Sequence, residues 1–176
     1  DVNGDGFSDV VIGAPDYSGS HAHEGRIYIY HGSPDGLEAM PAAKVSSSRT
    51  NGYLGGSVGT AGDVNGDGFA DIIVGARAMS IDQLYEGRAY VYYGSPTGIL
   101  GGGFPWYVEG DQFGAYLGTS VGTAGDVNGD GYADVVVGAD GYDAGEVNEG
   151  RVYIYLGSAE GLSNQPDWTA EGNQAD

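Results

Sequence analysis

A nine-residue stretch that begins DVNGDG occurs three times in this chain. The copies are DVNGDGFSD at 1–9, DVNGDGFAD at 63–71 and DVNGDGYAD at 126–134, and each runs into an apolar segment that ends in Gly-Ala. They start 62 and then 63 positions apart, and the motif EGR, followed by aliphatic and tyrosine residues, keeps the same spacing. Two motifs that keep one period identify an internal repeat. The period is nearer to a four-stranded propeller blade than to a helical pair of about 34 residues.

The composition between these motifs favours strands and turns. The 176 residues include 35 glycines and 14 tyrosines. Short runs of Val, Ile and Tyr bounded by Gly, Pro, Asp and Ser are typical of strands joined by turns. The third unit predicts four strands, at 116–125, at 133–139, at 151–158 and around Trp168. The sequence therefore predicts an all-β fold.

The second strand of each unit is apolar at successive positions, as in the run Val135, Val136, Val137. A strand with both faces buried is expected where one sheet lies between two others. The predicted fold is therefore a set of about three four-stranded antiparallel propeller blades.

The repeat also predicts the unit boundaries, at residues 1–52, 53–114 and 115–176, with the first unit lacking its first strand. Propellers close with typically four to eight blades. Three blades are therefore expected to be half of a six-bladed ring closed by a homodimer, or part of a seven-bladed ring whose other blades come from a longer chain. Because the sequence shows no initiator Met, signal peptide or apolar span of about 20 residues, we expect a processed part of a longer protein without direct membrane insertion.

The three acidic loops are the candidate sites. Oxygen-bearing side chains stand at loop positions 1, 3, 5 and 9, glycines at 4 and 6 permit sharp turns, and the backbone carbonyl of position 7 is a further oxygen. Hard cations such as Ca²⁺ take six to eight oxygens, so each loop is predicted to bind one Ca²⁺, up to three in all. The predicted ligands are Asp1, Asn3, Asp5, Phe7 and Asp9; Asp63, Asn65, Asp67, Phe69 and Asp71; and Asp126, Asn128, Asp130, Tyr132 and Asp134.

An EF-hand is excluded, because its loop needs a glutamate at position 12. That position holds Ile12, Val74 and Val137 here, each inside a predicted strand.

These motifs together resemble the FG-GAP repeat. The acidic loop is preceded by Leu-Gly-x-Ser-Val at 54–58 and 117–121, and the apolar strand ends in a complete Gly-Ala-Pro at 13–15. The other two copies lack the proline, and leucine replaces the aromatic residue of the FG element. The resemblance covers the whole chain. It implies the propeller of integrin α subunits and of secreted bacterial proteins, with Ca²⁺ bound through loop positions 1, 3, 5, 7 and 9.

Charge and cysteine content limit the partners and the setting. The formal net charge is −19, from 25 acidic and 6 basic residues, and there is no cysteine. Such a surface repels nucleic acid and anionic membranes. Without disulfides, bound calcium is expected to stabilise the fold, which indicates a secreted or cell-surface protein in a calcium-rich setting.

The leading functional hypothesis is a non-catalytic, calcium-binding extracellular propeller that serves as an adhesion or ligand-binding scaffold for a protein or a glycan. No recognisable nucleophile motif is present, so no enzyme activity is expected. A lectin-like propeller and an accessory part of a larger secreted enzyme remain alternatives. The segments 16–24, 78–86 and 140–149 differ most between units, and recognition is expected there.

Two smaller sets of repeated residues are given structural roles. Each EGR motif places an arginine two residues after a glutamate, which predicts a structural pair on the third strand. Trp106 and Trp168 occupy the same place in their units and are interpreted as core between blades.

Overall fold

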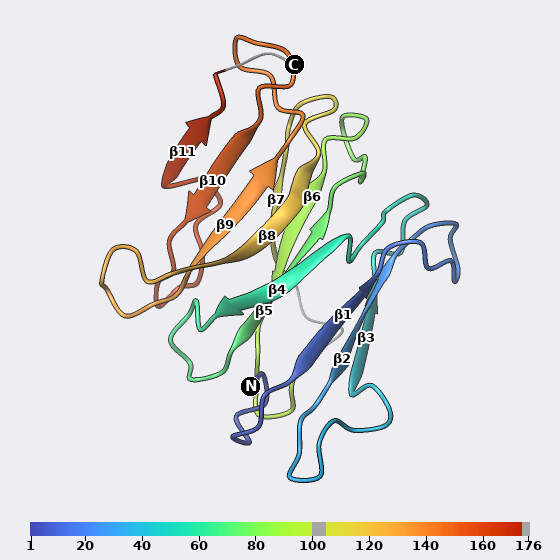
Figure 1. Ribbon diagram of the computed structural model, residues 1–176, viewed down its shortest axis with the longest axis vertical. Helices are drawn as coiled ribbons and strands as arrows, with labels where there is room; N and C mark the ends of the chain where they lie inside the picture. The colour runs from blue at the N-terminus through green and yellow to red at the C-terminus, as the bar shows by residue number, and fades with distance from the viewer. Residues whose placement is uncertain (100–104, 174–176) are drawn as a thin grey trace.

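The computed structural model describes residues 1–99 and 105–173, and within these ranges the chain is all strand, turn and loop, with no helix. The strands form three antiparallel sheets, which lie side by side in chain order from blue to red (Figure 1). The all-β prediction is therefore confirmed, and with it the blade architecture. No helix in the described part is long and apolar enough to cross a membrane.

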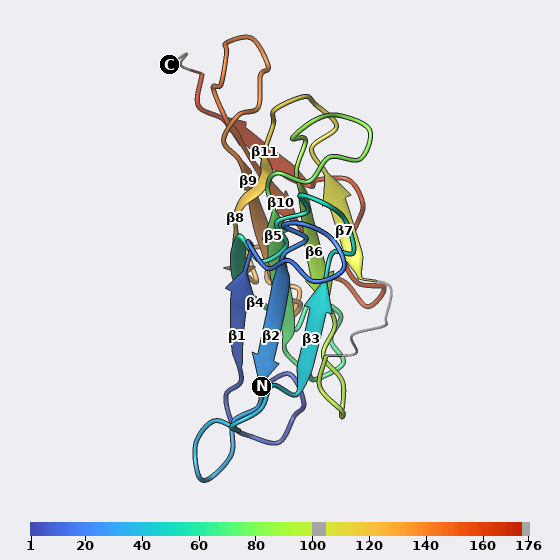
Figure 2. The same cartoon turned by 90° about the vertical axis from the view of Figure 1, so that its right-hand side faces the viewer.

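Each sheet is a meander in which neighbouring strands follow one another along the chain. Seen from the side in Figure 2, the sheets form upright layers, with loops at the two ends of the strands. The first sheet has three strands and the other two have four: β1 (Val10–Ala14), β2 (Arg26–Tyr30) and β3 (Ala43–Ser46); β4 (Ser57–Gly62), β5 (Asp71–Ala76), β6 (Arg88–Tyr92) and β7 (Trp106–Glu109); β8 (Leu117–Gly125), β9 (Asp134–Ala139), β10 (Arg151–Tyr155) and β11 (Trp168–Glu171).

All four strands predicted for the third unit are present, with ends that differ by at most three residues. The largest difference is at β10, which ends at Tyr155 instead of 158. Beyond it, the N–H groups of Gly157 and Ser158 donate to Asp134 and to the carbonyl of Val64, and so leave the sheet ladder. The boundaries between units remain a prediction, although each of the three sheets lies within one predicted unit.

The second strand of the middle blade has both faces buried, because β5 lies between two neighbouring sheets. Every residue of β5 is buried, and its side chains alternate between two cores. Ile72 and Val74 pack with Ile27 and Ile29 of the first blade, whereas Ile73 packs with Val135 of the third. Because the side chains of β5 alternate between its two faces, this one strand packs against both neighbouring blades.

The Gly-Ala ending has a steric cause. A Cβ atom on Gly75 would lie 2.0 Å from the carbonyl oxygen of Gly118 in the third blade, and one on Gly13 would lie 2.0 Å from that of Gly55 in the second. The glycine therefore permits the backbones of adjacent blades to approach each other closely. Alanine follows as a small buried residue in the second and third copies.

The first strand of each complete blade ends in a bulge that directs the chain into the acidic loop. The register between β4 and β5 shifts between Thr60 and Gly62, and that between β8 and β9 shifts between Thr123 and Gly125. Gly62 and Gly125 have φ of 81° and 76°, values that favour glycine.

Candidate functional site

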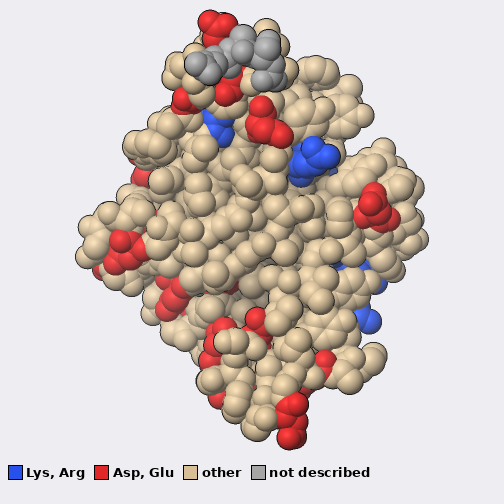
Figure 3. All heavy atoms as spheres, in the orientation of Figure 1, with Lys and Arg blue, Asp and Glu red and all other residues tan. Residues whose placement is uncertain are grey.

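The three acidic loops lie at the same end of their blades. Residues 63–70 join β4 to β5, residues 126–133 join β8 to β9, and the first loop leads into β1. In Figure 1 they follow the lower-left side of the molecule, and acidic atoms are scattered along that side in Figure 3. The fold therefore places the predicted metal ligands in one row, with one loop for each blade.

Within each loop, the aspartate at position 1 holds the backbone in a tight curl. Asp63 Oδ1 accepts hydrogen bonds from the N–H groups of Gly66 at 2.7 Å and Asp67 at 3.1 Å, and its Oδ2 accepts one from Gly68 at 2.9 Å. Both glycines have positive φ, 73° and 90°. The same bonds are formed by Asp1 and by Asp126 with the corresponding residues of their loops.

The aspartate at position 9 connects three segments of its own blade; it is buried in the second and third loops and half-buried in the first. Asp71 is fully buried, its Oδ2 accepts the N–H of Val64 at 2.9 Å, and its Oδ1 accepts the N–H of Gly94 at 2.8 Å. Asp9 and Asp134 form the equivalent bonds. Burial raises the pKa of Asp71 to about 6 against the effect of its hydrogen bonds, and the negative charges of Asp67 and Asp63 raise it further.

The donor set suits a hard cation. Carboxylate, amide and carbonyl oxygens are the ligands that Ca²⁺ takes, and three carboxylates within nine residues are a local excess of negative charge. Among the described residues, however, no three His, Cys, Asp or Glu side chains converge into a ready-made cage. The carboxylates already accept loop N–H groups, so a cation would share their oxygens with the backbone. The fit rests on donor chemistry, and calcium binding remains a prediction.

Sequence reasoning missed that the first and second loops also bond to the following blade. The carbonyl of Asp63 accepts the N–H of Ala133 at 2.9 Å, and the carbonyl of Val64 accepts that of Ser158 at 3.1 Å. The first loop bonds to the second blade in the same way. The valine at position 2 was the available signal, because an apolar residue in an acidic loop needs a core to enter. Val64 is fully buried in the core between the second and third blades.

The aromatic residue at position 7 connects one loop to the next. A Cβ atom on Gly4 would lie 2.7 Å from the Phe69 ring, and one on Gly66 would lie 2.6 Å from the Tyr132 ring. The ring at position 7 of one loop therefore covers the glycine at position 4 of the preceding loop. Position 7 was predicted as a carbonyl ligand, and the role of its side chain was not foreseen.

Two of the three repeated arginines form structural ion pairs, but their partner is not the nearby glutamate, and the third, Arg26, donates to the Ser46 hydroxyl. Arg88 forms an ion pair with Glu109 of β7, and Arg151 forms one with Glu171 of β11, each on the neighbouring strand. Glu86 instead accepts N–H groups of the loop that precedes it. The cause is register, since Arg88 stands opposite Glu109 in the ladder.

The tryptophans differ in environment. Trp106 is buried between the second and third blades, and its Nε1–H donates to the carbonyl of Ser163. Its ring packs edge-on against that of Tyr155, with the ring centroids 5.0 Å apart. The core interpretation is confirmed for it. Trp168 is 54% exposed, because no described blade follows β11.

Three adjoining antiparallel meanders, each with an acidic loop at the same end, define the class of this protein: a chain of β-propeller blades. Family models give the particular type. A model for the FG-GAP repeat matches residues 117–155, and a model for an FG-GAP-like repeat matches residues 1–74. The chain is therefore an FG-GAP repeat protein of the integrin-like propeller type.

Whole-chain similarity agrees with this. Integrin alpha-5 of Xenopus laevis is 31% identical over 98% of this chain, which covers 18% of that protein. Integrin alpha pat-2 of Caenorhabditis elegans is 36% identical over 98% of the chain, which covers 14% of it. Human phosphatidylinositol-glycan-specific phospholipase D is 32% identical over 99%, which covers 22% of it. The chain spans about a fifth or less of the length of these relatives.

Proposed function

We propose that this chain is a calcium-stabilised propeller scaffold that binds a protein ligand outside the cell or at its surface. The observation that carries this proposal is the row of three alike loops, each bonded to its own blade, with the first and second bonded to the following blade as well. A cation held by such a loop stabilises the joint between blades as well as the loop itself. The rigid frame leaves variable loops and grooves free for recognition.

We propose further that the chain has no catalytic role of its own. Two of the relatives described above are named integrins and the third is named a phospholipase, and this chain covers only a minor part of each. A segment that is similar in integrins and in a phospholipase is more simply explained as a scaffold than as a catalytic site. A glycan ligand is the second candidate, because a polar groove lined by tyrosine and tryptophan opens between the second and third blades.

The loops are expected to prefer Ca²⁺ to Mg²⁺. Mg²⁺ requires near-octahedral geometry at about 2.0–2.1 Å, whereas these loops offer an irregular set of oxygens shared with backbone N–H groups. Isothermal titration calorimetry of metal-free protein should show tighter binding of Ca²⁺. Asp130→Ala, which removes the position-5 oxygen of the third loop, should reduce the number of bound ions by one. Equal affinities for the two metals would contradict the proposed loop geometry.

We propose that further blades cover the outer faces of the first and third blades. Val127 is 55% exposed, although the equivalent Val64 is fully buried against the next blade, and Trp168 is exposed where Trp106 is buried. On the opposite outer face, Ile12 is 47% exposed, although the equivalent Val74 is fully buried. Each end thus presents side chains of the kind that a neighbouring blade covers elsewhere in the same chain.

A second copy can supply those blades and close a six-bladed ring. Light scattering on the purified chain is then expected to give twice its mass of 18.0 kDa. Val152→Asp, on the outer face of β10, should return the chain to a monomer. Phe113→Asp, at an exposed site in the segment between β7 and β8, should not. A wild-type monomer at high concentration would rule out the dimer and leave further blades of a longer chain as the cover.

A further inference from the structure

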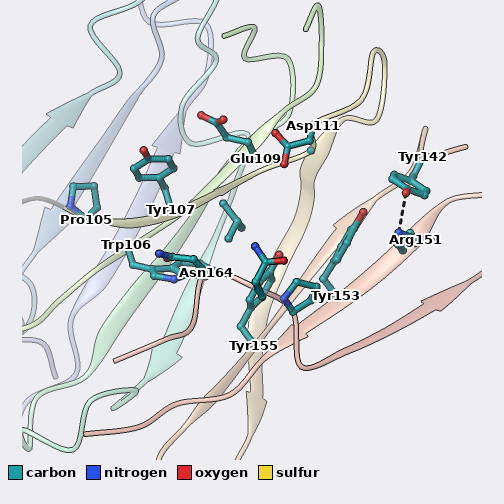
Figure 4. Close-up of a pocket in the computed structure, with 14 residues that line it drawn as sticks. Pro105, Trp106, Tyr107, Glu109, Asp111, Tyr142, Arg151, Tyr153, Tyr155 and Asn164 are labelled. Atoms are coloured by element: carbon teal, nitrogen blue, oxygen red, sulfur yellow. Dashed lines mark hydrogen bonds between the residues drawn. The ribbon is translucent and has the colours of Figure 1, made fainter. Parts of the chain in front are cut away.

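A groove of about 620 Å³ separates the outer strand of the second blade from the third blade (Figure 4). One side of the groove is formed by seven consecutive residues, 105–111, which include the whole of β7. The side chains of a strand alternate between two faces, so a groove lined by every residue in turn follows the edge of the strand. β7 is the last strand of its sheet, and this edge has no partner strand in the described structure.

The register shows which backbone groups point into the groove. The N–H of Gly110 donates to the carbonyl of Gly87, and these two residues stand opposite each other one step beyond the Arg88–Glu109 end of the β6–β7 ladder. Bonded pairs alternate along an antiparallel ladder, so Val108 and Trp106 direct their backbone groups towards β6. Tyr107 and Glu109 direct theirs to the free edge. Two N–H and two C=O groups are thus available to a further strand.

The other side of the groove combines aromatic rings and polar groups from the third blade. Tyr153 and Tyr155 extend from β10 towards β7, and Asn164 and Gln165 add amides (Figure 4). Tyr155 is 3% exposed as a whole residue and belongs to the lining of the groove. Burial raises the pKa of Tyr155, so the hydroxyl remains a donor at neutral pH. A tyrosine hydroxyl and two amides along this wall offer hydrogen-bonding groups to a polar ligand.

The charges of the groove favour a basic ligand. Arg151 lines the groove, and its guanidinium donates a hydrogen bond to the Tyr142 hydroxyl and forms an ion pair with Glu171. Asp111, at the end of β7, is exposed and has no cationic partner within residues 1–99 and 105–173. The chain as a whole carries −19. A lysine or arginine is therefore attracted to this end of the groove.

We propose that this groove binds an extended, basic peptide segment of a protein partner, which adds to β7 as a fifth strand. Backbone hydrogen bonds to Tyr107 and Glu109 provide the affinity, and the tyrosine wall and Asp111 select the side chains. At about 3.3 Å per residue, the seven-residue edge spans roughly 20 Å and accommodates a peptide of six or seven residues. The inference rests on the ligand-binding role proposed above and names its site and the chemistry of the partner.

Selection from a random heptapeptide phage library on the calcium-loaded chain tests this proposal. The expected result is enrichment of sequences with one or two Lys or Arg among β-forming residues. A selected peptide, labelled and followed by fluorescence anisotropy, should bind at least tenfold more weakly when alternate amides are N-methylated, since one lost edge hydrogen bond is worth on the order of tenfold. Its affinity should also fall as the salt concentration rises.

Variants of the chain locate the site. Tyr107→Pro removes an outward N–H and should weaken binding about tenfold, a loss of one hydrogen bond. Tyr107→Ala keeps that N–H and should bind much better than the proline variant. Lys44→Pro makes the same change at the equivalent position of β3 and should leave the affinity unchanged. Asp111→Asn should weaken binding and reduce its dependence on salt.

The failures are distinguishable. Selection without enrichment, or binding unaffected by both Tyr107→Pro and N-methylation, would overturn the strand-addition proposal. A neutral oligosaccharide array that binds wild type but not Tyr155→Phe, with no peptide bound, would assign the groove to a glycan instead. If calcium stabilises the chain while neither probe binds, the groove inference fails and the scaffold proposal stands.

Discussion

A calcium chelator is expected to lower the melting temperature of this chain by roughly 5–10 °C for each loop that it empties. A ligand present at 100 times its Kd stabilises the folded state by about 2.7 kcal/mol, and for a domain of this size 1 kcal/mol shifts the melting temperature by about 2–4 °C. The physical reason is that the unfolded chain does not hold the loop oxygens together. Differential scanning calorimetry, with chelator and then with millimolar Ca²⁺ restored, measures the effect.

The control is magnesium, which at the same concentration should restore only a small part of the lost stability. The place of the loss is also informative, because the first and second loops bond to the following blade through carbonyls such as those of Asp63 and Val64. Emptying one loop should therefore loosen a joint between two blades, and hydrogen exchange should rise on both sides of it. A melting temperature indifferent to chelator would contradict the calcium proposal.

Asp71→Ala is expected to destabilise the chain by about 3–5 kcal/mol even without calcium. The substitution leaves the N–H groups of Val64 and Gly94 buried without an acceptor, and each such group costs about 1–3 kcal/mol. It also leaves a small cavity at the start of β5, where the side chain is fully buried. Urea denaturation in the presence of chelator measures this loss directly.

Asp67→Ala is the matched control, since Asp67 is an exposed predicted ligand of the same loop. In chelator its cost should stay within about 1 kcal/mol, as for other exposed side chains. In calcium both variants should lose the contribution of one bound ion. Equal costs for the two variants in chelator would show that the buried hydrogen bonds of Asp71 contribute little to the fold.

The loops show where prediction from sequence ends. Their position-1 aspartates and their glycines were recognisable, because an acidic turn is built from neighbours in the chain. The second role of Asp71 was not, because Gly94 lies 23 residues further along. The pairing of Arg88 with Glu109 was missed for a similar reason, since ladder register brings them together.

By itself, the sequence determined the repeat, the strands and the position of every acidic loop. These features depend on local periodicity and turn chemistry, which act over a few residues. Only the tertiary structure decided which face of each strand packs against which blade. For this reason Trp106 is buried, whereas Trp168 is exposed. It also decided that Val64 and the ring of Tyr132 join one blade to the next, and that the edge of β7 opens onto a groove. Contacts between near-identical units depend on how the blades stack, and that stacking is a property of the packed sheets, not of any single segment.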